Sequence, residues 1–327
     1  MALCNGGIMT LDEFVPPFDL AFLAGGQAVV PVVEDVMRTA VTHITKIGQG
    51  FYAHVYQAEL AESPHSVIIK CHKYAGRTAK EAQQLTKLKQ HALIQIPIVY
   101  AVQLATDACP CEMLLMETIP GADAGKVDFP DASTQAQFVE KAIENLLTWH
   151  SVHNPEGFGP LGGPFVPRWV DALSQKLTVY HKQIHQEKQK AVVSDYVMRI
   201  IDRSFEALPA IFGHINGPAS LVHSDYNIWN MMVDPETFQL TGIIDPIDAG
   251  WAHYEIDLFH LKNGRSDSGL LERYLNTVDV DEQFWMRFNF YWFWDDIKHY
   301  LRMGWYEEGR FRGFAQTLAR EMDKWLK

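Results

Sequence analysis

Two aspartates and an asparagine in the second half of the chain have a spacing that suits phosphoryl transfer. Asp225 and Asn230 lie in a polar loop between two short apolar runs, and Asp245 follows a further apolar run. Transfer to a hydroxyl requires a carboxylate that orients the hydroxyl and accepts its proton, and oxygen ligands that hold Mg²⁺ against nucleotide phosphates. Asp225 fits the first role, and Asn230 and Asp245 fit the second. Turns also contain Asp and Asn that bond the local backbone, but the ordered set between predicted strands favours the catalytic interpretation.

The order of these residues resembles the protein-kinase-like small-molecule phosphotransferases, which include aminoglycoside phosphotransferases, choline kinases and fructosamine (ketosamine) kinases. The segment His223-Ser-Asp225-x4-Asn230 matches their catalytic loop, and Asp245 matches their metal-binding aspartate. The resemblance implies an enzyme that uses ATP and Mg²⁺, with catalytic Asp225, with His223 supporting the loop, and with Asn230 and Asp245 as metal ligands. It also implies that the phosphoryl acceptor is a hydroxyl-bearing small molecule.

The sequence around Asp245 looks most like fructosamine kinases, through Asp245-Pro246 and the segment 251–258. Within that segment, Asp257 matches a structural aspartate that braces the catalytic loop. The favoured acceptor is therefore a sugar-like or ketosamine metabolite, with an aminoglycoside or choline-type acceptor as the alternative. A low-turnover nucleotide-binding regulator, a protein kinase and an enzyme that transfers the whole AMP unit are further hypotheses. The distance from Asp245 to Asp257 is too short for a protein-kinase activation loop.

A glycine turn in the first half predicts a cradle for nucleotide phosphates. Gly48 and Gly50 lie between two predicted strands, the second of which contains Val55. Glycines let backbone amides approach phosphate oxygens because no Cβ obstructs them. A glycine pair is also common in hairpin turns, and Ala53 stands where protein kinases usually have a third glycine, so the turn is expected to close more loosely over phosphate.

Lys70 ends the next predicted strand and is expected to contact the phosphates. A helix predicted from Thr78 to about His91 has Glu81 in its first turn, where it could pair with Lys70. Thr78 and Glu81 also have the spacing of a capping box, in which the glutamate bonds the backbone at the helix start. We favour the ion pair because Lys70 would otherwise lack a partner.

The segment from Glu112 to Gly121 is an apolar strand that ends in a Pro-Gly turn. By resemblance it is the hinge between two lobes, with Met116 in the nucleotide site and the backbone of Glu117 and Ile119 bonding adenine. An ordinary core strand is the alternative. The predicted fold is α+β: a bilobal protein-kinase-like fold with a small, mainly antiparallel β lobe that has one helix, and a larger, mainly helical lobe. The predicted parts are residues 1–40, an extension packed on the first lobe, then 41–120 and 121–327.

Composition limits the possible function classes. The chain has 327 residues and a formal net charge of −12, which disfavours nucleic acids and anionic membranes as partners. Its four cysteines have no repeated pair spacing, which fits the reducing cytoplasm, and Cys109-Pro-Cys111 is expected to be a turn between strands. The amino terminus lacks the pattern of a signal peptide, and no apolar run approaches the roughly 20 residues of a membrane span.

Later segments are expected to build the second lobe. Residues 136–152 have helical apolar spacing, with His150 and His153 interpreted as structural, and 154–167 should be an extended loop near the acceptor. The segment 168–212 should form two helices, with a solvated polar face at 182–190. The aromatics between Phe284 and Tyr306 are interpreted mainly as core, with a few of them in the acceptor pocket.

Overall fold

The computed structural model describes residues 17–107, 109–186, 189 and 191–326. The chain divides into two compact units, of which the first comprises residues up to 120 apart from 91–94, and the second comprises 91–94 and everything from Gly121 onward. The expected extension, residues 1–40, is described only from residue 17, and this part belongs to the first unit. Cys4 and the predicted absence of a signal peptide lie outside the described residues.

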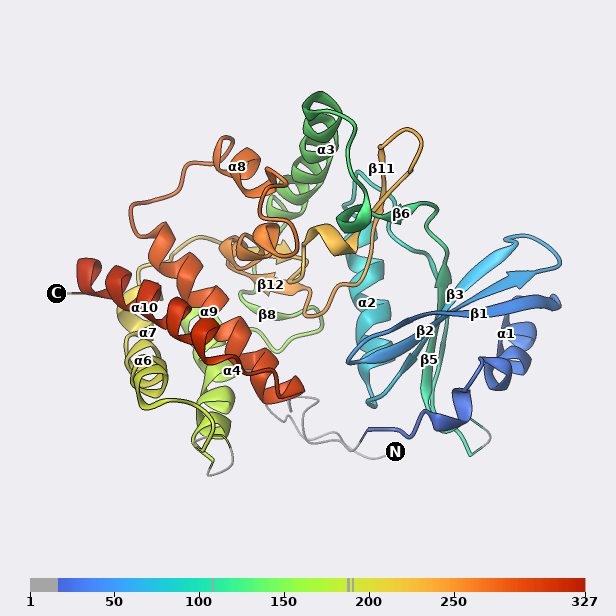
Figure 1. Cartoon of the computed structure of the whole chain (residues 1–327), viewed down its shortest axis with the longest axis horizontal. Helices are drawn as coiled ribbons and strands as arrows, with labels where there is room; N and C mark the ends of the chain where they lie inside the picture. The colour runs from blue at the N-terminus through green and yellow to red at the C-terminus, as the bar shows by residue number, and fades with distance from the viewer. Residues whose placement is uncertain (1–16, 108, 187–188, 190, 327) are drawn as a thin grey trace. The chain divides into compact units, whose positions relative to one another are not determined.

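The first unit is built on one antiparallel five-stranded sheet, with the strand order β1-β2-β3-β5-β4 (Figure 1). Its strands are β1 (Val41–Gln49), β2 (Ala53–Leu60), β3 (Ser66–His72), β4 (Val99–Gln103) and β5 (Glu112–Glu117). Helix α2 (Arg77–Lys89) covers one face of the sheet, and α1 (Val30–Met37), with the short turns η2 (Ala21–Leu23) and η3 (Gln27–Val29), covers the other.

The alternation of side chains along β3 gives the two sheet faces different chemistry. Val67, Ile69 and Cys71 point into an apolar cluster with the amino-terminal segment, whereas Lys70 and His72 bond to helix α2. Successive side chains of a strand point to opposite faces. The same strand therefore supplies core on one side and the polar residues of a site on the other.

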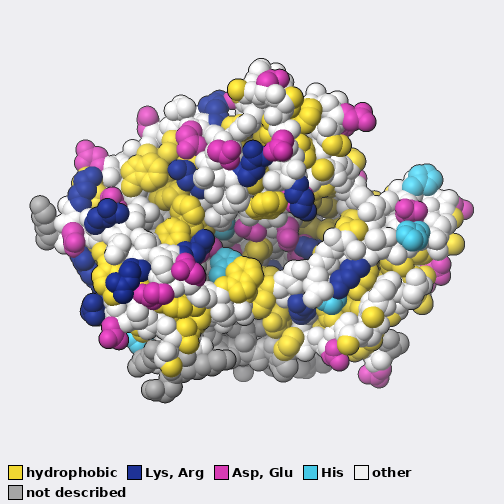
Figure 2. Space-filling model, viewed as in Figure 1, with side chains coloured by type: hydrophobic (Ala, Val, Ile, Leu, Met, Phe, Trp, Pro, Cys, Tyr) yellow, Lys and Arg dark blue, Asp and Glu magenta, His cyan; other side chains and the backbone are white. Residues whose placement is uncertain are grey.

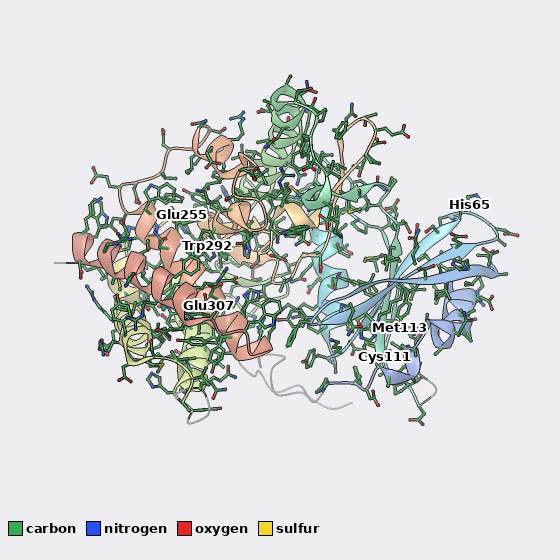
Figure 3. The ribbon with its side chains drawn as sticks, in the orientation of Figure 1. His65, Cys111, Met113, Glu255, Trp292 and Glu307 are labelled. Atoms are coloured by element: carbon green, nitrogen blue, oxygen red, sulfur yellow. The ribbon has the colours of Figure 1, made fainter. Side chains whose placement is uncertain are left out.

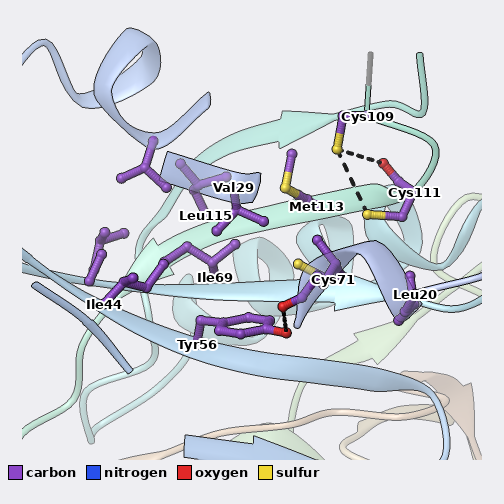
Figure 4. Packing of buried hydrophobic residues seen from close by; sticks show 14 of the residues in the cluster. Leu20, Val29, Ile44, Tyr56, Ile69, Cys71, Cys109, Cys111, Met113 and Leu115 are labelled. Carbon is purple, nitrogen blue, oxygen red and sulfur yellow. Dashed lines mark hydrogen bonds between the residues drawn. The ribbon is translucent and has the colours of Figure 1, made fainter. Parts of the chain in front are cut away.

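The amino-terminal segment packs on this face of the sheet in an apolar cluster that includes Leu20, Val29 and Tyr56 (Figure 4). The Tyr56 hydroxyl donates to the Leu23 carbonyl at 2.8 Å, so the ring is buried with its polar atom satisfied. Gly26 has a φ of 79°, and a Cβ there would lie 2.8 Å from the Tyr56 ring. Both the left-handed backbone and the close approach require glycine at this position.

The Cys109–Cys111 segment lies between β4 and β5, as predicted, and its two Sγ atoms are 3.9 Å apart. Cys71, Cys109 and Cys111 are free and buried. Burial raises the pKa of Cys109 to about 11. Buried neutral thiols of this kind are poor nucleophiles, which supports a packing role.

The second unit is mainly helical, and with the antiparallel first unit it confirms the predicted α+β class. Its helices are α3 (Ala132–His150), α4 (Trp169–Ile184), α6 (Asp195–Glu206), α7 (Leu208–Phe212), α8 (Leu270–Leu275), α9 (Phe284–Met303) and α10 (Glu308–Trp325). One small sheet has the order β11-β10-β6 and the other the order β7-β9-β12-β8. These strands are β6 (Ala122–Asp123), β7 (His153–Asn154), β8 (Gly159–Pro160), β9 (Ala219–Val222), β10 (Met231–Val233), β11 (Leu240–Ile243) and β12 (Gly250–Ala252). The turns η4 (Ala124–Lys126), η5 (Ile228–Asn230), η6 (Tyr254–Asp257) and η7 (Phe259–Lys262) complete it.

Helix α3 begins at Ala132, four residues before the predicted start. Asp131 is its N-cap and accepts a hydrogen bond from the Thr134 amide at 2.8 Å. Such a cap satisfies an amide that the first turn leaves without an intrahelical partner. The region 168–212 forms three described helices instead of the predicted two, because a short α7 follows α6 directly.

Most aromatic side chains of α9 lie in the core, as the sequence analysis predicted. Phe284, Phe290 and Phe293 are almost completely buried, whereas Trp292, labelled on α9 in Figure 3, is only partly buried. Trp285 and Trp305 are 45% and 69% exposed. The face of the second unit in Figure 2 carries interspersed acidic and basic side chains without a large patch of one sign. Among the described residues, no helix is long and apolar enough to cross a membrane.

Candidate active site

In the first unit, Lys70 is held by a buried carboxylate. Its Nζ lies 2.6 Å from Glu81 Oε1 on α2, and the other carboxylate oxygen, Oε2, lies 2.8 Å from His72 Nε2. Helix α2 begins at Arg77 after Gly76 and has no side-chain N-cap bond. Thr78 is therefore inside the helix, and the ion pair is found instead of the alternative capping box.

The Glu81 carboxylate is ionised despite its burial. Burial opposes the charge, but Lys70 and the bond from His72 outweigh it and hold the pKa of Glu81 at about 2. The His72 Nδ1 atom lies 2.7 Å from the Thr78 hydroxyl, so the ring is fixed at both nitrogens. Glu81 is thus a rigid acceptor that sets the position of the Lys70 ammonium group.

The glycine turn joins β1 to β2, and Lys73 secures it. The Lys73 ammonium donates to the Gly50 carbonyl at 2.9 Å, and the Gly50 amide donates to the Ala53 carbonyl. A Cβ at Gly50 would meet its nearest described atom at 3.9 Å, and one at Gly48 would touch Val55 at 3.6 Å. Neither glycine has a left-handed φ. The fold therefore tolerates a side chain at both positions, which leaves approach of a ligand as a reason for glycine.

The expected adenine-binding segment lies at the end of β5. Met116 and Ile119 are buried, while the Glu117 amide donates to the Ile98 carbonyl at 2.8 Å. The Glu117 carboxylate accepts from the Ile98 amide at 3.0 Å. Since the backbone amide of Glu117 already donates to Ile98, the backbone group of Glu117 that could contact adenine is its carbonyl oxygen.

In the second unit, Asp257 fixes the backbone of the predicted catalytic loop. Its Oδ2 accepts from the His223 amide at 3.0 Å, and its Oδ1 accepts from the Ser224 amide at 2.6 Å. His150 Nε2 lies 3.0 Å from Oδ2, and His150 Nδ1 lies 2.8 Å from the Tyr274 hydroxyl. Asp257 is completely buried. The residue occupies the bracing position that the resemblance implied, and His150 is structural, as expected.

The loop backbone is strained where Asp257 holds it. Ser224 has a φ of 64°, and a left-handed conformation costs a non-glycine residue about 1–3 kcal/mol. The His223 ring is buried, stacks on Trp149 and contacts Tyr226 edge-on. Burial lowers the pKa of His223 to about 4. The neutral, packed ring suits a supporting role in the loop.

The Asp225 carboxylate is held by two asparagines. Its Oδ1 accepts from Asn227 at 2.7 Å, and its Oδ2 accepts from Asn230 at 2.8 Å. The His260 Nδ1 atom lies 3.3 Å from Oδ1. These contacts fix the orientation of the carboxylate, and Asn227 and His260 are contacts that the sequence analysis did not identify.

Asp225 has the electrostatics of a general base. Burial is the main cause that raises the pKa of Asp225, to about 7, and the nearby negative charge of Asp245 adds to it. A base is most effective when its pKa is close to the working pH. A carboxylate with this pKa can accept a proton near neutral pH.

Asn230 and Asp245 come together at one end of the β10–β11 hairpin. Met231 pairs with Ile243, and the Ile244 amide donates to the Asn230 carbonyl at 2.9 Å, so the two residues flank the last rungs of the ladder. The Asn230 side-chain nitrogen is bonded to Asp225, which leaves its Oδ1 as the possible metal ligand. Asp245 has a left-handed φ of 62°. An amide oxygen beside carboxylates is a donor set that suits Mg²⁺.

A pocket of about 450 Å³, partly open to solvent, lies in the second unit beside this loop. Its wall includes Ser224 and His260, and thus adjoins Asp225. Apolar and aromatic side chains from α4, α9 and the η6–η7 region line it, together with Lys176, Asp248, Asp295 and Lys298. Phe290, Tyr291 and Trp294 are the α9 aromatics that reach the pocket, in line with the expectation that a few would do so. Lys176, Asp248 and Lys298 were missed, because no motif marks them.

The segment predicted as an extended loop, 154–167, contributes strand β8, which pairs with β12. Phe158 and Val166 form an isolated antiparallel bridge. The segment is therefore mainly an extended loop, as predicted, and its regular pairs are confined to Asn154 in β7 and to β8, the two edge strands of a short sheet. The Phe158 ring packs on Trp169.

On α9, Arg287 forms a fully buried ion pair with Glu255, which is labelled in Figure 3, at 2.6 Å. This pair anchors η6, which contains Asp257, to the helical part of the unit. It connects the brace of the catalytic loop to the core, although neither partner takes part in the chemistry.

Several known proteins resemble this chain in sequence or in fold. A model of the phosphotransferase enzyme family matches residues 43–287. Uncharacterized protein YcbJ of Escherichia coli K12 is 24% identical over 258 residues, which cover 78% of this chain and 86% of that protein. A Thermobifida fusca protein provisionally named a fructosamine-3-kinase has a similar structure, with a TM-score of 0.65, 18% identity and coverage of 89% of this chain and 98% of that one.

A thermostable mutant of the aminoglycoside phosphotransferase APH(4)-Ia, solved with ADP and hygromycin B, is also similar in structure, with a TM-score of 0.68 and 13% identity. The match covers 90% of this chain and 99% of that one. At these identities the solved structures establish the fold, and they confirm the kinase-like architecture that the motif order predicted. The family match spans most of the chain, including both the glycine turn and the catalytic loop. The chain therefore belongs to the phosphotransferase enzyme family.

Proposed function

We propose that this phosphotransferase transfers the γ-phosphoryl group of ATP to a hydroxyl of a small sugar-like or ketosamine metabolite. The observation that carries the proposal is the state of Asp225. Its carboxylate is fixed by Asn227 and Asn230, its pKa is raised to about 7, and it adjoins a pocket that is partly open to solvent. A carboxylate in this setting suits deprotonation of a bound hydroxyl.

The predicted site residues of the second unit have separate tasks in the proposed reaction. Asp225 orients the acceptor hydroxyl and takes its proton as the oxygen attacks the terminal phosphorus, while the bond from that phosphorus to the β–γ bridging oxygen breaks and ADP leaves with the electron pair. His223 and Asp257 keep the loop in shape. Asn230 and Asp245 would hold Mg²⁺, which would neutralise phosphate charge. The closeness of Asp245 to Asp225, which raises the pKa of Asp225, supports a cation at this position.

The first unit binds the nucleotide. Lys70 contacts the phosphates in the position that Glu81 sets, and the turn containing Gly48 and Gly50 places backbone amides against phosphate oxygens. Val55 follows that turn on β2 and encloses the base. At the end of β5, Met116 and Ile119 complete the adenine site, in which the carbonyl of Glu117 accepts from the base. The free, buried cysteines of the described chain support the proposal that the protein works in the reducing cytoplasm.

The decisive experiment measures ATP-dependent phosphorylation of a ketosamine and sugar panel by the wild type, Asp225→Asn and a matched control. Asp267→Asn is the control, because Asp267 is an exposed aspartate of the same unit. We expect Asp225→Asn to lose about 100-fold or more in kcat, and the control to lose nothing. In the wild type, kcat/KM should rise with pH up to about 7, because the base must be deprotonated and a cation at Asp245 would lower the pKa of Asp225.

An Asp225→Asn enzyme with wild-type turnover contradicts the proposal. Nucleotide binding without ATP consumption in the presence of any metabolite pool would instead indicate a low-turnover regulator. An aminoglycoside or choline-type acceptor remains the alternative substrate, and side-by-side turnover of these compounds and ketosamines distinguishes them.

A further inference from the structure

The pocket beside Asp225 has a charge composition that differs from that of the chain. Overall, acidic residues exceed basic ones by twelve. The pocket wall has two lysines, Lys176 and Lys298, and two aspartates, Asp248 and Asp295, so its formal charges cancel. An acidic pocket would be expected for a polycationic acceptor, and this wall does not provide one.

Both aspartates of the wall are already bonded to its lysines. The Lys176 Nζ atom lies 2.9 Å from Asp248 Oδ2. On α9, Lys298 pairs with Asp295, whose other oxygen lies 3.2 Å from His299 Nδ1. A ligand cation would therefore have to compete for these carboxylates with ammonium groups that are attached to the same wall.

The lysines retain donor capacity that the aspartates do not use. An ammonium group has three N–H donors, and each lysine has one carboxylate partner among the described residues. The Lys298 side chain is only 11% exposed, so solvent reaches it poorly, and a buried cation is stabilised by filling its remaining donors.

Lys298 keeps its charge in this setting. Burial disfavours the ammonium form, but the charge of Asp295 outweighs burial and raises the pKa of Lys298. Lys176 and Arg302 act against it as further positive charges, and Arg302 also donates to the hydroxyl of Tyr180 on the pocket wall at 3.2 Å. Lys176, Lys298 and Arg302 are thus close enough for their charges to act on one another.

Lys176 and Lys298 line the pocket whose wall includes Ser224 and His260, the neighbours of Asp225. We infer, building on the proposed function, that the phosphoryl acceptor carries an anionic group, either a carboxylate or a phosphate ester, that binds Lys176 and Lys298 while its hydroxyl lies at Asp225. A ketosamine derived from a free amino acid has this chemistry, because it carries a carboxylate as well as sugar hydroxyls. A polycationic aminoglycoside lacks it.

The test compares acceptors that differ in one group. Fructosyl-glycine and fructosyl-glycinamide share the sugar and the amine, and only the first has a carboxylate. Fructose 6-phosphate and fructose form the corresponding phosphate pair, and kanamycin is the polycation. Binding is measured by calorimetry without nucleotide, and turnover by ADP release. A hydrogen-bonded charge contact predicts that the anionic member of one pair binds about ten- to a hundred-fold more tightly than its neutral partner, and which pair responds identifies the group.

Variants assign the effect to the pocket. Lys176→Met and Lys298→Met should abolish the preference for the anionic member and raise its KM, with kcat changed less. Lys182→Met is the control, because Lys182 is an exposed lysine of the same helix α4. Lys176 is more exposed than Lys298, at 25% of its side chain, so Lys176→Met tests the inference even where Lys298→Met fails to fold.

The possible outcomes separate the inference from the proposed function. Equal binding of the members of both pairs, or preferred turnover of kanamycin, overturns the inference and leaves phosphotransfer intact. Loss of charge preference in Lys182→Met as well as Lys176→Met also overturns it. If no compound is phosphorylated but the anionic members bind in a manner that depends on Lys176, the anion site stands and the proposed phosphotransfer fails.

Discussion

Replacing Asp257 by asparagine tests whether the brace sets the catalytic loop. The change keeps the size of the side chain but turns one acceptor oxygen into an NH₂ donor. In the structure both oxygens accept backbone N–H groups, at 2.6 Å from Ser224 and 3.0 Å from His223. Either orientation of the amide therefore leaves one buried backbone N–H facing a donor.

The expected loss follows from this count of bonds. An unsatisfied buried N–H costs about 1–3 kcal/mol. The remaining bond also loses its charge assistance, which costs about 1 kcal/mol more. His150 can retain a bond by changing its tautomer, because its ring nitrogen can accept from the new amide. We therefore expect Asp257→Asn to destabilise the second unit by about 2–4 kcal/mol and to lower kcat, while the affinity for nucleotide changes little.

The assay combines chemical denaturation, nucleotide titration and steady-state kinetics. Asp323→Asn is the control, because it removes a charge that is paired with Arg203 on the surface. Burial opposes the Asp257 charge, but the bond from His150 and the other contacts outweigh it, so the folded pKa of Asp257 is lowered. Its contribution is then fully present above the unfolded pKa of about 4 and declines in acid, where the stabilities of variant and wild type should converge. An Asp257→Asn protein with wild-type stability and kcat would refute the bracing role.

Two further predictions concern the first unit. The pKa of Glu81 is lowered from 4.5 to about 2, which corresponds to about 3 kcal/mol of folding free energy. Glu81→Gln should therefore lose about 3 kcal/mol of stability at neutral pH, and the difference from the wild type should shrink as pH falls from about 4.5 towards 2. A loss of stability that is independent of pH in a denaturation series would contradict the ion-pair account. Gly50→Ala should leave the melting temperature unchanged, because its Cβ would meet nothing closer than 3.9 Å, but it should raise KM for ATP. Gly121→Ala is the comparison and should destabilise the fold, because its Cβ would lie 2.3 Å from the Val233 carbonyl oxygen. Unchanged ATP kinetics in Gly50→Ala would show that the turn has no role in phosphate binding.

The sequence predicted those parts of the site that short-range order determines. Asp225 and Asn230 are five positions apart in one turn, so their contact follows from local geometry. The pairing of Lys70 with Glu81 could be predicted because strand alternation directs Lys70 to one sheet face and the helical spacing after it places Glu81 there. The capping alternative failed because the helix begins at Arg77 with Gly76 as its N-cap, which places Thr78 two residues beyond the cap position.

The acceptor pocket could not be predicted in the same way. Lys176, Asp248 and Lys298 come from distant segments and have no motif, and lysines on amphipathic helices usually face solvent. Their convergence depends on how α4 and α9 pack, which periodicity alone does not determine. Polar residues on predicted helices are therefore the positions where this sequence is least informative about function.

The left-handed backbone at Ser224 and Asp245 has a consequence for directed evolution. Glycine adopts these dihedrals without steric penalty, so selection for heat tolerance alone would favour it at both positions, and at Asp245 it would also delete a proposed metal ligand. Mutant libraries intended to raise the melting temperature of this protein should keep Ser224 and Asp245 fixed and vary other positions. At Asp245, a gain in melting temperature and a loss of turnover would arise from the same substitution.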